Sequence, residues 1–498
     1  MTKILLVNPP VFNDIGKCKS ETPPLSLLYL AGYLEKYGFR EVKVIDADME
    51  MITWPALEEL FIKEKPDIVG VGGSSFVLPA LIKTAEIAKR CLPNSLVVAG
   101  GFGPSKEPGR VLELARNNID LIIIGEGEQT LLDVVQRRSQ GRSDFGDIAG
   151  LAFLDKTGQL IVTETRGYIM DLDSIPWPAF HLLTSDFLKY PGAPLGDKKY
   201  GEMKKPIATV LAARGCPHRC FFCSLGSKLW RKRTPKDIVD EIEFYKNKFG
   251  VKSIQIYDDE FIGMTPKQNE WVEEICEEII KRRLNLPWLI QGRCSPYLEL
   301  KTLKKMREAG CCWIWWGVES GSQRLLDEVI HKDIKIADVY RAFDLAKQAG
   351  IKSLIFIMVG FPGETPEDVG MSVKLIKKIK PDDLGIHVTT PFPGSQLRKY
   401  LEEHDLLEQK LEKLEDYYTL DTDRHTHFHT KEMTAAEIEK YYKFIVFKFG
   451  EHGFWYFLKF GIVSLATIDG WKKLFKRANI TVNYLINWLR FNYFKINK

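Results

Sequence analysis

The residues with the clearest chemical potential are three cysteines in the stretch RGCPHRCFFC, which begins at Arg214. Cys216, Cys220 and Cys223 follow a C-x3-C-x2-C spacing in a chain that has nine cysteines. A disulfide would leave one of the three thiols unpaired. Structural zinc prefers four ligands in two pairs, and no second pair follows here. Three thiolates suit a 4Fe-4S cluster, because its fourth iron then stays open to a ligand. We therefore predict that these cysteines bind such a cluster.

The elements that must position the cysteines are expected in residues 206–405. Short apolar runs alternate there with amphipathic helical stretches. The runs are IATVLAA, SIQIYDD, WLIQGR, CWIWWGVES, SLIFIMVGFPG and LGIHVTTPFPG. Six βα units make most of a (β/α) barrel, whose functional side chains lie at the carboxyl ends of the strands. Polar residues and glycines end these runs, which predicts a site at that face.

The cysteine loop, with Phe222 just before the last cysteine, resembles the radical S-adenosylmethionine superfamily. In that family three cysteines hold the cluster, and its open iron binds the amino and carboxylate groups of S-adenosylmethionine. An electron from the cluster cleaves this molecule to methionine and a 5′-deoxyadenosyl radical. The resemblance therefore implies two cofactors, the cluster and S-adenosylmethionine.

The following strands end in further motifs of that family, namely YDDEF, QGR, GVESG and GFPGET. A cationic zwitterion needs carboxylates for its amine and ribose hydroxyls, and an arginine for its carboxylate. By resemblance, Asp258 and Asp259 lie at the amine, where the family often has Gly-Gly-Glu. Arg293 and Glu319 then contact the carboxylate and ribose, unless the two pair with each other inside the barrel. The adenine side is assigned to Gly360, Pro362 and Gly363.

Residues 1–145 predict a doubly wound parallel sheet of the Rossmann or flavodoxin type. Its apolar runs are ILLV, VKVI, IVGVGG, LVVAGG and LIIIGEGE, and most end in glycine or small polar residues. This domain resembles the cobalamin-binding half of the cobalamin-dependent radical S-adenosylmethionine enzymes. The resemblance assigns corrin and nucleotide contacts to Ser74, Ser75, Gly100, Gly101, Gly125 and Glu126. The first histidine of the chain is His181, so this domain supplies no histidine to cobalt, as in the methylase-like branch. The alternative is a sheet with a different ligand, because strands that end in glycine are common in this fold.

The remaining segments carry weaker signals. Residues 146–205 are expected to be a linker with one hairpin, and residues 406–498 a helical extension that starts with a charged helix. His425, His427 and His429 in HTHFH are interpreted as an exposed polar strand rather than a metal site. The aromatic and basic end of the chain predicts helices that either pack on the protein or lie in a membrane interface.

Composition limits the classes of partner. The net charge is only +4, which argues against a nucleic-acid-binding protein. No signal peptide or membrane span is evident, so we expect a cytoplasmic protein, membrane-associated only if its C-terminal extension binds lipid.

The resemblance implies a function as well as a fold. The expected reaction is hydrogen abstraction from an unactivated carbon by the 5′-deoxyadenosyl radical, followed by methyl transfer from methylcobalamin, which a second S-adenosylmethionine regenerates. The substrate is expected to be a small molecule or a lipid, and a flavodoxin or ferredoxin the electron donor. One alternative is an oxidative cyclase that acts on a tetrapyrrole or lipid with the same cofactors. Another is a cobalamin-binding regulatory module with an inactive barrel.

Overall fold

The computed structural model describes residues 2–15, 20–190, 200–224, 228–408, 410–421 and 426–449. Met1–Glu439 form one compact unit, which contains both predicted domains. The last described element is helix α15 (Ala435–Phe449). Among these described residues, no helix combines the length and apolar character needed to cross a lipid bilayer.

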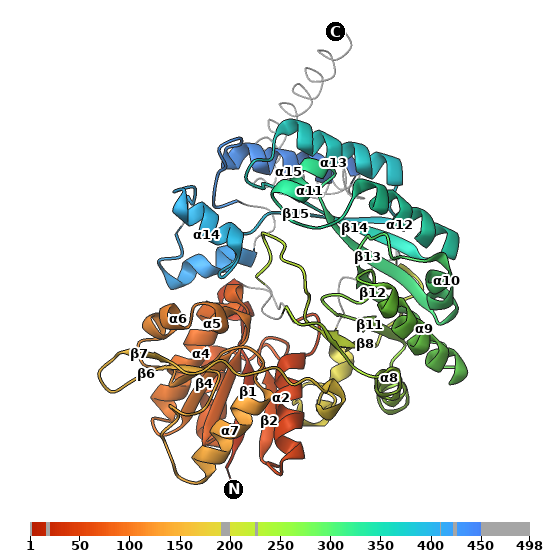
Figure 1. Ribbon diagram of the computed structural model, residues 1–498. Helices are drawn as coiled ribbons and strands as arrows, with labels where there is room; N and C mark the ends of the chain where they lie inside the picture. Colours follow the sequence, from red (N-terminus) through yellow and green to blue (C-terminus); the bar gives the residue numbers. More distant parts are fainter. Residues whose placement is uncertain are drawn as a thin grey trace, which may run out of the picture. The chain divides into compact units, whose positions relative to one another are not determined.

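The N-terminal sheet is built as the sequence predicts. Its strands are β1 (Ile4–Asn8), β2 (Val42–Asp46), β3 (Ile68–Gly72), β4 (Leu96–Gly100) and β5 (Leu121–Ile123). They pair in parallel in the order 2-1-3-4-5, which is the flavodoxin-like order. The helices are α1 (Phe12–Ile15), α2 (Leu25–Lys36), α3 (Trp54–Glu64), α4 (Leu78–Cys91), α5 (Phe102–Lys106), α6 (Pro108–Ala115) and α7 (Glu128–Ser139). Figure 1 draws this part in red to orange. The apolar runs are buried because helices cover the sheet, which confirms the predicted doubly wound class.

The hairpin expected in the linker extends this sheet. Strands β6 (Leu151–Leu154) and β7 (Leu160–Val162) pair antiparallel with each other, and β6 pairs antiparallel with β5. A free hairpin is marginally stable, so docking on the β5 edge supplies the apolar contacts that it needs. In the described part of the rest of the linker, the regular elements include the 3₁₀ turns η2 (Leu172–Ser174), η3 (Phe180–Leu182) and η4 (Phe187–Lys189), and the prolines there disfavour a longer helix.

The second sheet contains the six predicted strands. They are β8 (Ile207–Val210), β11 (Ser253–Ile256), β12 (Trp288–Gly292), β13 (Cys311–Glu319), β14 (Lys352–Val359) and β15 (Asp383–Val388). All pair in parallel and in sequence order, as in a partial barrel. The main helices between them are α8 (Pro235–Phe249), α9 (Pro266–Lys281), α10 (Leu300–Glu308), α12 (Ile336–Ala349) and α13 (Pro366–Ile379), with α11 (Gln323–Glu328) after β13. Figure 1 shows these helices along the outside of the sheet.

Local sequence sets where these helices begin. Thr234, Thr265 and Thr365 each precede a proline, and each threonine oxygen accepts a hydrogen bond from a backbone amide of the first turn. Threonine at the N-cap and proline at the next position are both favourable, because the cap satisfies an amide that the helix leaves without a partner. Gly250 and Gly350 end α8 and α12 in the left-handed region, at φ values of 64° and 74°.

Alternation along β13 decides which tryptophans face the barrel interior. Trp313 and Trp315 pack with Leu289, Leu354 and Phe356 on the inner face. Trp316 points the other way, where its indole donates a 3.1 Å hydrogen bond to Ser353 and its ring lies near Phe343 of α12. Trp316 is therefore turned away from the barrel interior, because neighbouring strand residues face opposite sides.

The segment after the barrel is not the single charged helix that was expected. Helix α14 (Gln396–Glu403) ends where Asp405 has a φ of 54°, and a 3₁₀ segment η6 (Leu414–Asp421) follows. Leu411 and Tyr417 are buried in the core of the N-terminal sheet. The chain therefore returns to its first domain after completing the barrel.

Two predictions on the tail have different outcomes. In HTHFH, Phe428 is buried and forms an isolated bridge with Leu407, while His427 and His429 are half-buried, so the segment is less exposed than expected. His425 and the aromatic, basic segment beyond residue 449 lie outside the described residues.

Candidate functional site

The three cysteines lie in one loop, which is closed by a short strand pair. Strand β9 (Ala213–Arg214) precedes the loop and pairs antiparallel with β10 (Arg231–Lys232), which follows it. All three thiols are half-buried, and no disulfide joins any of the described cysteines. The amide of Cys223 donates a 3.0 Å hydrogen bond to the carbonyl of Cys220. Burial raises the pKa of the Cys216 thiol to about 11.

The described residues contain no group of three or more His, Cys, Asp or Glu side chains that converges on a single metal ion. A 4Fe-4S cluster does not require three side chains to converge on one ion, because each thiolate binds a different iron of the cluster.

The aspartate pair after β11 divides into a structural and an exposed residue. Asp258 is buried, and its carboxylate accepts a 2.7 Å hydrogen bond from the amide of Ala212, which lies between β8 and β9. Burial raises the pKa of Asp258 well above its usual range. Asp259 is exposed. Asp258 therefore ties β11 to the start of the cysteine loop.

Glu260, the third acid of YDDEF, was missed by sequence reasoning. Its side chain is 5% exposed, and its Oε1 has no hydrogen-bond partner among the described residues. Burial raises its pKa to about 7, against the opposing influence of Arg293 and Lys332. Its other oxygen lies 3.9 Å from Nε2 of His218, the histidine between the first two cysteines. Glu260 is therefore a buried acid beside the cysteine loop, and the family's Gly-Gly-Glu pattern was the signal that could have found it.

Arg293 is held at the end of β12 with part of its guanidinium unsatisfied. The residue is buried, and its Nη2 has no hydrogen-bond partner within the described chain. Its amide donates a 3.2 Å hydrogen bond to the carbonyl of Ile262. Gly263, at a φ of 106°, packs so closely that a Cβ there would lie 2.5 Å from the carbonyl oxygen of Arg293. An unsatisfied buried guanidinium is costly unless an anion completes it, which fits the carboxylate role predicted for Arg293.

Glu319 pairs with a lysine that the sequence did not indicate. Its Oε1 lies 2.8 Å from Nζ of Lys332, and both side chains are buried. Burial lowers the pKa of Lys332, but the interactions with Glu319 and Cys220 raise it, and the net shift is upward. The ammonium also lies 6.0 Å from the ring centre of Phe222 in the cysteine loop. The alternative pairing of Glu319 with Arg293 is not seen, and the motif GVESG contains no sign of Lys332.

The GFPG turn after β14 is organised by a buried acid. Gly360 has a φ of 103°, and its amide donates a 2.6 Å hydrogen bond to Glu364, which also accepts from the amide of Phe361 at 3.2 Å. Burial raises the pKa of Glu364 to about 8. The rings of Phe361 and Phe222 are 5.8 Å apart, which joins this turn to the cysteine loop. Pro362 is buried and Gly363 half-buried beside them.

The strand ends of the N-terminal sheet are tightly packed turns. Ser74 is half-buried and Ser75 buried, just after β3. A Cβ on Gly101 would lie 2.5 Å from the carbonyl oxygen of Gly73, so the turns after β3 and β4 need glycine there. A Cβ on Gly100 would make only an ordinary van der Waals contact, at 3.7 Å from Cβ of Ile123. A Cβ on Gly125 would have no atom of the described residues within 4 Å.

Glu126, assigned to the corrin or nucleotide from sequence, has a protein partner. Both terminal nitrogens of Arg231 donate hydrogen bonds to its carboxylate, one of them at 2.9 Å.

Comparisons with known proteins agree with this two-part architecture. A model of the Radical SAM superfamily matches residues 210–376, and a model of the B12 binding domain matches residues 14–135. An uncharacterized methyltransferase of Pyrococcus horikoshii is 33% identical, covering 81% of this chain and 84% of that protein. An anaerobic magnesium-protoporphyrin IX monomethyl ester cyclase of Rubrivivax gelatinosus is also 33% identical, covering 79% and 69%.

A solved structure shares the fold across nearly the whole chain. It is the cobalamin-dependent S-adenosylmethionine radical enzyme OxsB with aqua-cobalamin and S-adenosylmethionine bound. The TM-score is 0.73 at 18% identity, covering 99% of this chain and 73% of that one.

Proposed function

We propose that this chain, which belongs to the radical S-adenosylmethionine superfamily and to its branch with an N-terminal B12-binding domain, methylates an unactivated carbon of a small-molecule substrate. The family resemblance predicted from the motifs is confirmed, and the cofactors of such an enzyme are a 4Fe-4S cluster, S-adenosylmethionine and cobalamin. When bound, the cluster supplies the electron that cleaves S-adenosylmethionine, and cobalamin carries the methyl group.

One observation carries the proposal for the barrel. Cys216, Cys220 and Cys223 lie in a single loop, next to which Arg293 and Glu260 keep buried polar atoms that the described residues leave unsatisfied. We propose that the three thiolates bind the cluster. The guanidinium of Arg293 then receives the carboxylate of S-adenosylmethionine, and the carboxylate of Glu260 receives its amine. Both ligand groups are charged, so each would satisfy a buried group that is otherwise costly to keep.

The other side chains at this mouth position these groups. Lys332 neutralises Glu319 and lies against Phe222, so it fixes the far side of the cysteine loop. Glu364 holds the amides of Gly360 and Phe361, which shapes the turn that we propose for the adenine side together with Pro362 and Gly363. Asp258 ties β11 to the start of the loop, and Asp259 stays exposed beside it.

For the N-terminal sheet, we propose that cobalamin binds at the carboxyl ends of β3, β4 and β5, the usual place for ligands of this fold. Ser74, Ser75, Gly100, Gly101 and Gly125 lie there. No histidine precedes His181 in the chain, so cobalt receives no histidine from this domain, as expected for a methylase. We also propose that a flavodoxin or ferredoxin supplies the electron.

A second candidate function is oxidative ring closure. The relative in Rubrivivax gelatinosus is named as a cyclase and is as similar in identity as the methyltransferase relative. Methylation is favoured because the methyltransferase relative matches over a larger share of its own length.

The test does not require the substrate to be known. The anaerobically purified full chain, with reconstituted cluster and cobalamin, is reduced and given S-adenosylmethionine with a deuterated methyl group. A methylase forms 5′-deoxyadenosine and also places the deuterated methyl on cobalamin, both of which are measured by mass spectrometry. Formation of 5′-deoxyadenosine without label on cobalamin would favour the cyclase. Neither product under strong reductant would favour the regulatory module and overturn the proposal.

A further inference from the structure

Three arginines surround the cysteine loop, and two of them bind the N-terminal domain. Arg214 is the last residue of β9, Arg231 the first of β10, and Arg233 follows β10. We call β9 and β10 together the loop clip. A strand pair of two residues on each side has little stability of its own, so other contacts must fix its place.

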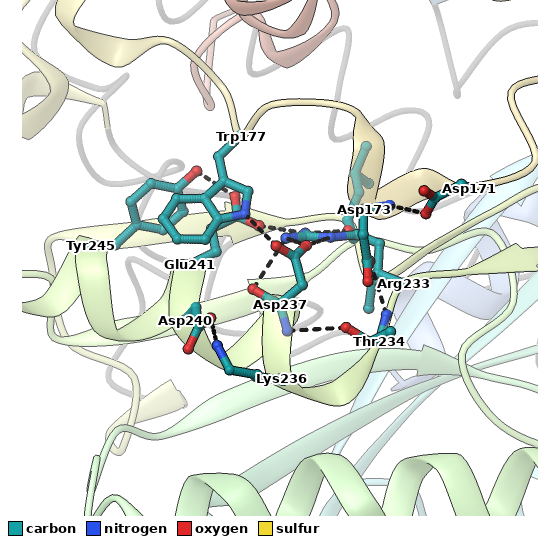
Figure 2. Close-up of polar contacts among 12 residues, drawn as sticks. Asp171, Asp173, Trp177, Arg233, Thr234, Lys236, Asp237, Asp240, Glu241 and Tyr245 are labelled. Carbon is teal, nitrogen blue, oxygen red and sulfur yellow. Dashed lines mark hydrogen bonds and ion pairs between the residues drawn. The ribbon is translucent and has the colours of Figure 1, made fainter.

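Arg233 fixes the clip to the barrel. Its guanidinium donates a 2.9 Å hydrogen bond to the carbonyl of Leu211 and a 2.7 Å bond to Asp237, and it pairs with the buried Glu241. Figure 2 shows Arg233 between Asp237 and Glu241, with Trp177 of the linker donating to Asp237 at 3.1 Å. The barrel side of the clip is therefore held by one buried arginine.

Arg214 and Arg231 fix the clip to the N-terminal domain. Arg231 binds Glu126 through both terminal nitrogens and also donates a 2.8 Å hydrogen bond to the carbonyl of Ile169. Arg214 lies 2.8 Å from Glu128, the first residue of α7, where the helix dipole favours a carboxylate. The exposed side-chain fractions are 2% for Arg231 and 5% for Glu128, against 21% for Glu126 and 17% for Arg214, so each pair has one buried and one partly exposed partner.

Aromatic rings complete the two arginine sites. The guanidinium of Arg214 lies 5.1 Å from the ring centre of Tyr29 on α2, and that of Arg231 lies 4.7 Å from the ring centre of Tyr168. A planar guanidinium can lie flat on a ring and keep its ion pair, so these contacts favour arginine over lysine.

We infer that Arg214 with Glu128, and Arg231 with Glu126, form a positioning clamp that sets where the cysteine loop lies relative to the cobalamin domain. Buried ion pairs contribute little net stability compared with apolar packing, but removing one partner leaves a buried charge uncompensated. Glu126 follows Gly125, one of the proposed cobalamin contacts, and Arg214 lies two residues before Cys216. The clamp thus joins the turn after β5 to the loop that carries the cysteines. The inference rests on the proposed function, because only an enzyme with both cofactors needs this spacing. Arg231 and Glu126 are positioning residues, since they act through the loop.

The test compares E126Q, R231Q and their double variant with D144N, all in the full chain. Asp144 is an exposed acid of the same domain and pairs with Arg142, so D144N controls for loss of a surface charge. Hydrogen exchange measured by mass spectrometry follows the amides of 213–216 and 228–233. We expect exchange there to accelerate about 100-fold in E126Q and R231Q, with little change in D144N. The double variant should not multiply the effects of the single variants, because the pair of Arg231 with Glu126 is already broken in each of them.

A spectroscopic signature separates positioning from general stability. In samples with equal iron and cobalamin content, the magnetic interaction between cob(II)alamin and the reduced cluster is measured by electron paramagnetic resonance. We expect E126Q to weaken or broaden this interaction and D144N to preserve it. R231K keeps the charge but not the two-nitrogen contact, so its magnetic interaction should lie between those of the parent and E126Q. R231K replaces R231Q if that variant does not fold. The clamp would be overturned if E126Q had the same hydrogen-exchange rates and the same magnetic interaction as the parent. A parent that binds no cluster or cobalamin would instead overturn the proposed function, while the exchange comparison would still test the clamp.

Discussion

Glu364 should make the barrel less stable as pH rises, and its replacement by glutamine should remove this effect. The carboxyl ordinarily ionises near 4.5, and burial in the folded chain raises its pKa to about 8. Between these values the folded chain binds more protons than the unfolded chain, so the free energy of unfolding falls with rising pH. A shift of about 3.5 units, at about 1.4 kcal/mol per unit, gives a total loss of about 5 kcal/mol.

The E364Q variant isolates this contribution. A glutamine oxygen can still accept from the amides of Gly360 and Phe361, but it carries no charge at any pH. Between about pH 5.5 and about pH 8.5, stability of the parent should fall relative to E364Q by about 3 kcal/mol. Urea unfolding followed by tryptophan fluorescence measures this, because the described buried tryptophans lie in the barrel.

The control for Glu364 is E367Q, an exposed acid in the first turn of α13. Its pH profile should match that of the parent. An unchanged difference in stability between parent and E364Q across this pH range would refute the assignment of Glu364 as a buried, protonated acid.

Two further predictions concern the barrel mouth. R293K keeps the charge but loses the forked geometry, so we expect binding of S-adenosylmethionine, measured by anaerobic equilibrium dialysis, to weaken about 10-fold or more; parental affinity would count against the carboxylate role. K332M should destabilise the barrel by about 3–5 kcal/mol, because Glu319 is then buried without its 2.8 Å partner. Adding E319Q to K332M should recover much of that loss in urea unfolding, and additive losses would show that the pair does not act as a unit.

The βα alternation predicted both sheets, because apolar runs between amphipathic stretches determine which segments are buried. The same local signal placed Cys216, Arg293 and Gly360 at strand ends, since strand polarity follows from the order of elements. The face of the sheet on which a strand residue lies was harder to predict, and the structure places Trp316 toward helix α12.

Partners from distant segments could not be predicted. Lys332 is 13 residues from Glu319, in a turn without a motif, and only the folded chain brings the two together. Glu126 was assigned to a cofactor by resemblance, and the sequence did not indicate that it also pairs with an arginine 105 residues away. Glu260 was within reach of sequence reasoning, but the aspartates before it drew the assignment. Burial separates the exposed Asp259 from Asp258 and Glu260, which are both buried.

The central claim is that Cys216, Cys220 and Cys223 hold a cluster that cleaves S-adenosylmethionine. Its most direct test is the iron–sulfur content of anaerobically reconstituted alanine variants, with 5′-deoxyadenosine formation measured on the same samples. We predict that C216A, C220A and C223A each lose the cluster and the product while retaining cobalamin. C91A, which removes a half-buried thiol of the N-terminal domain, should keep the cluster, the 5′-deoxyadenosine product and cobalamin. A full cluster in the triple alanine variant would contradict the account.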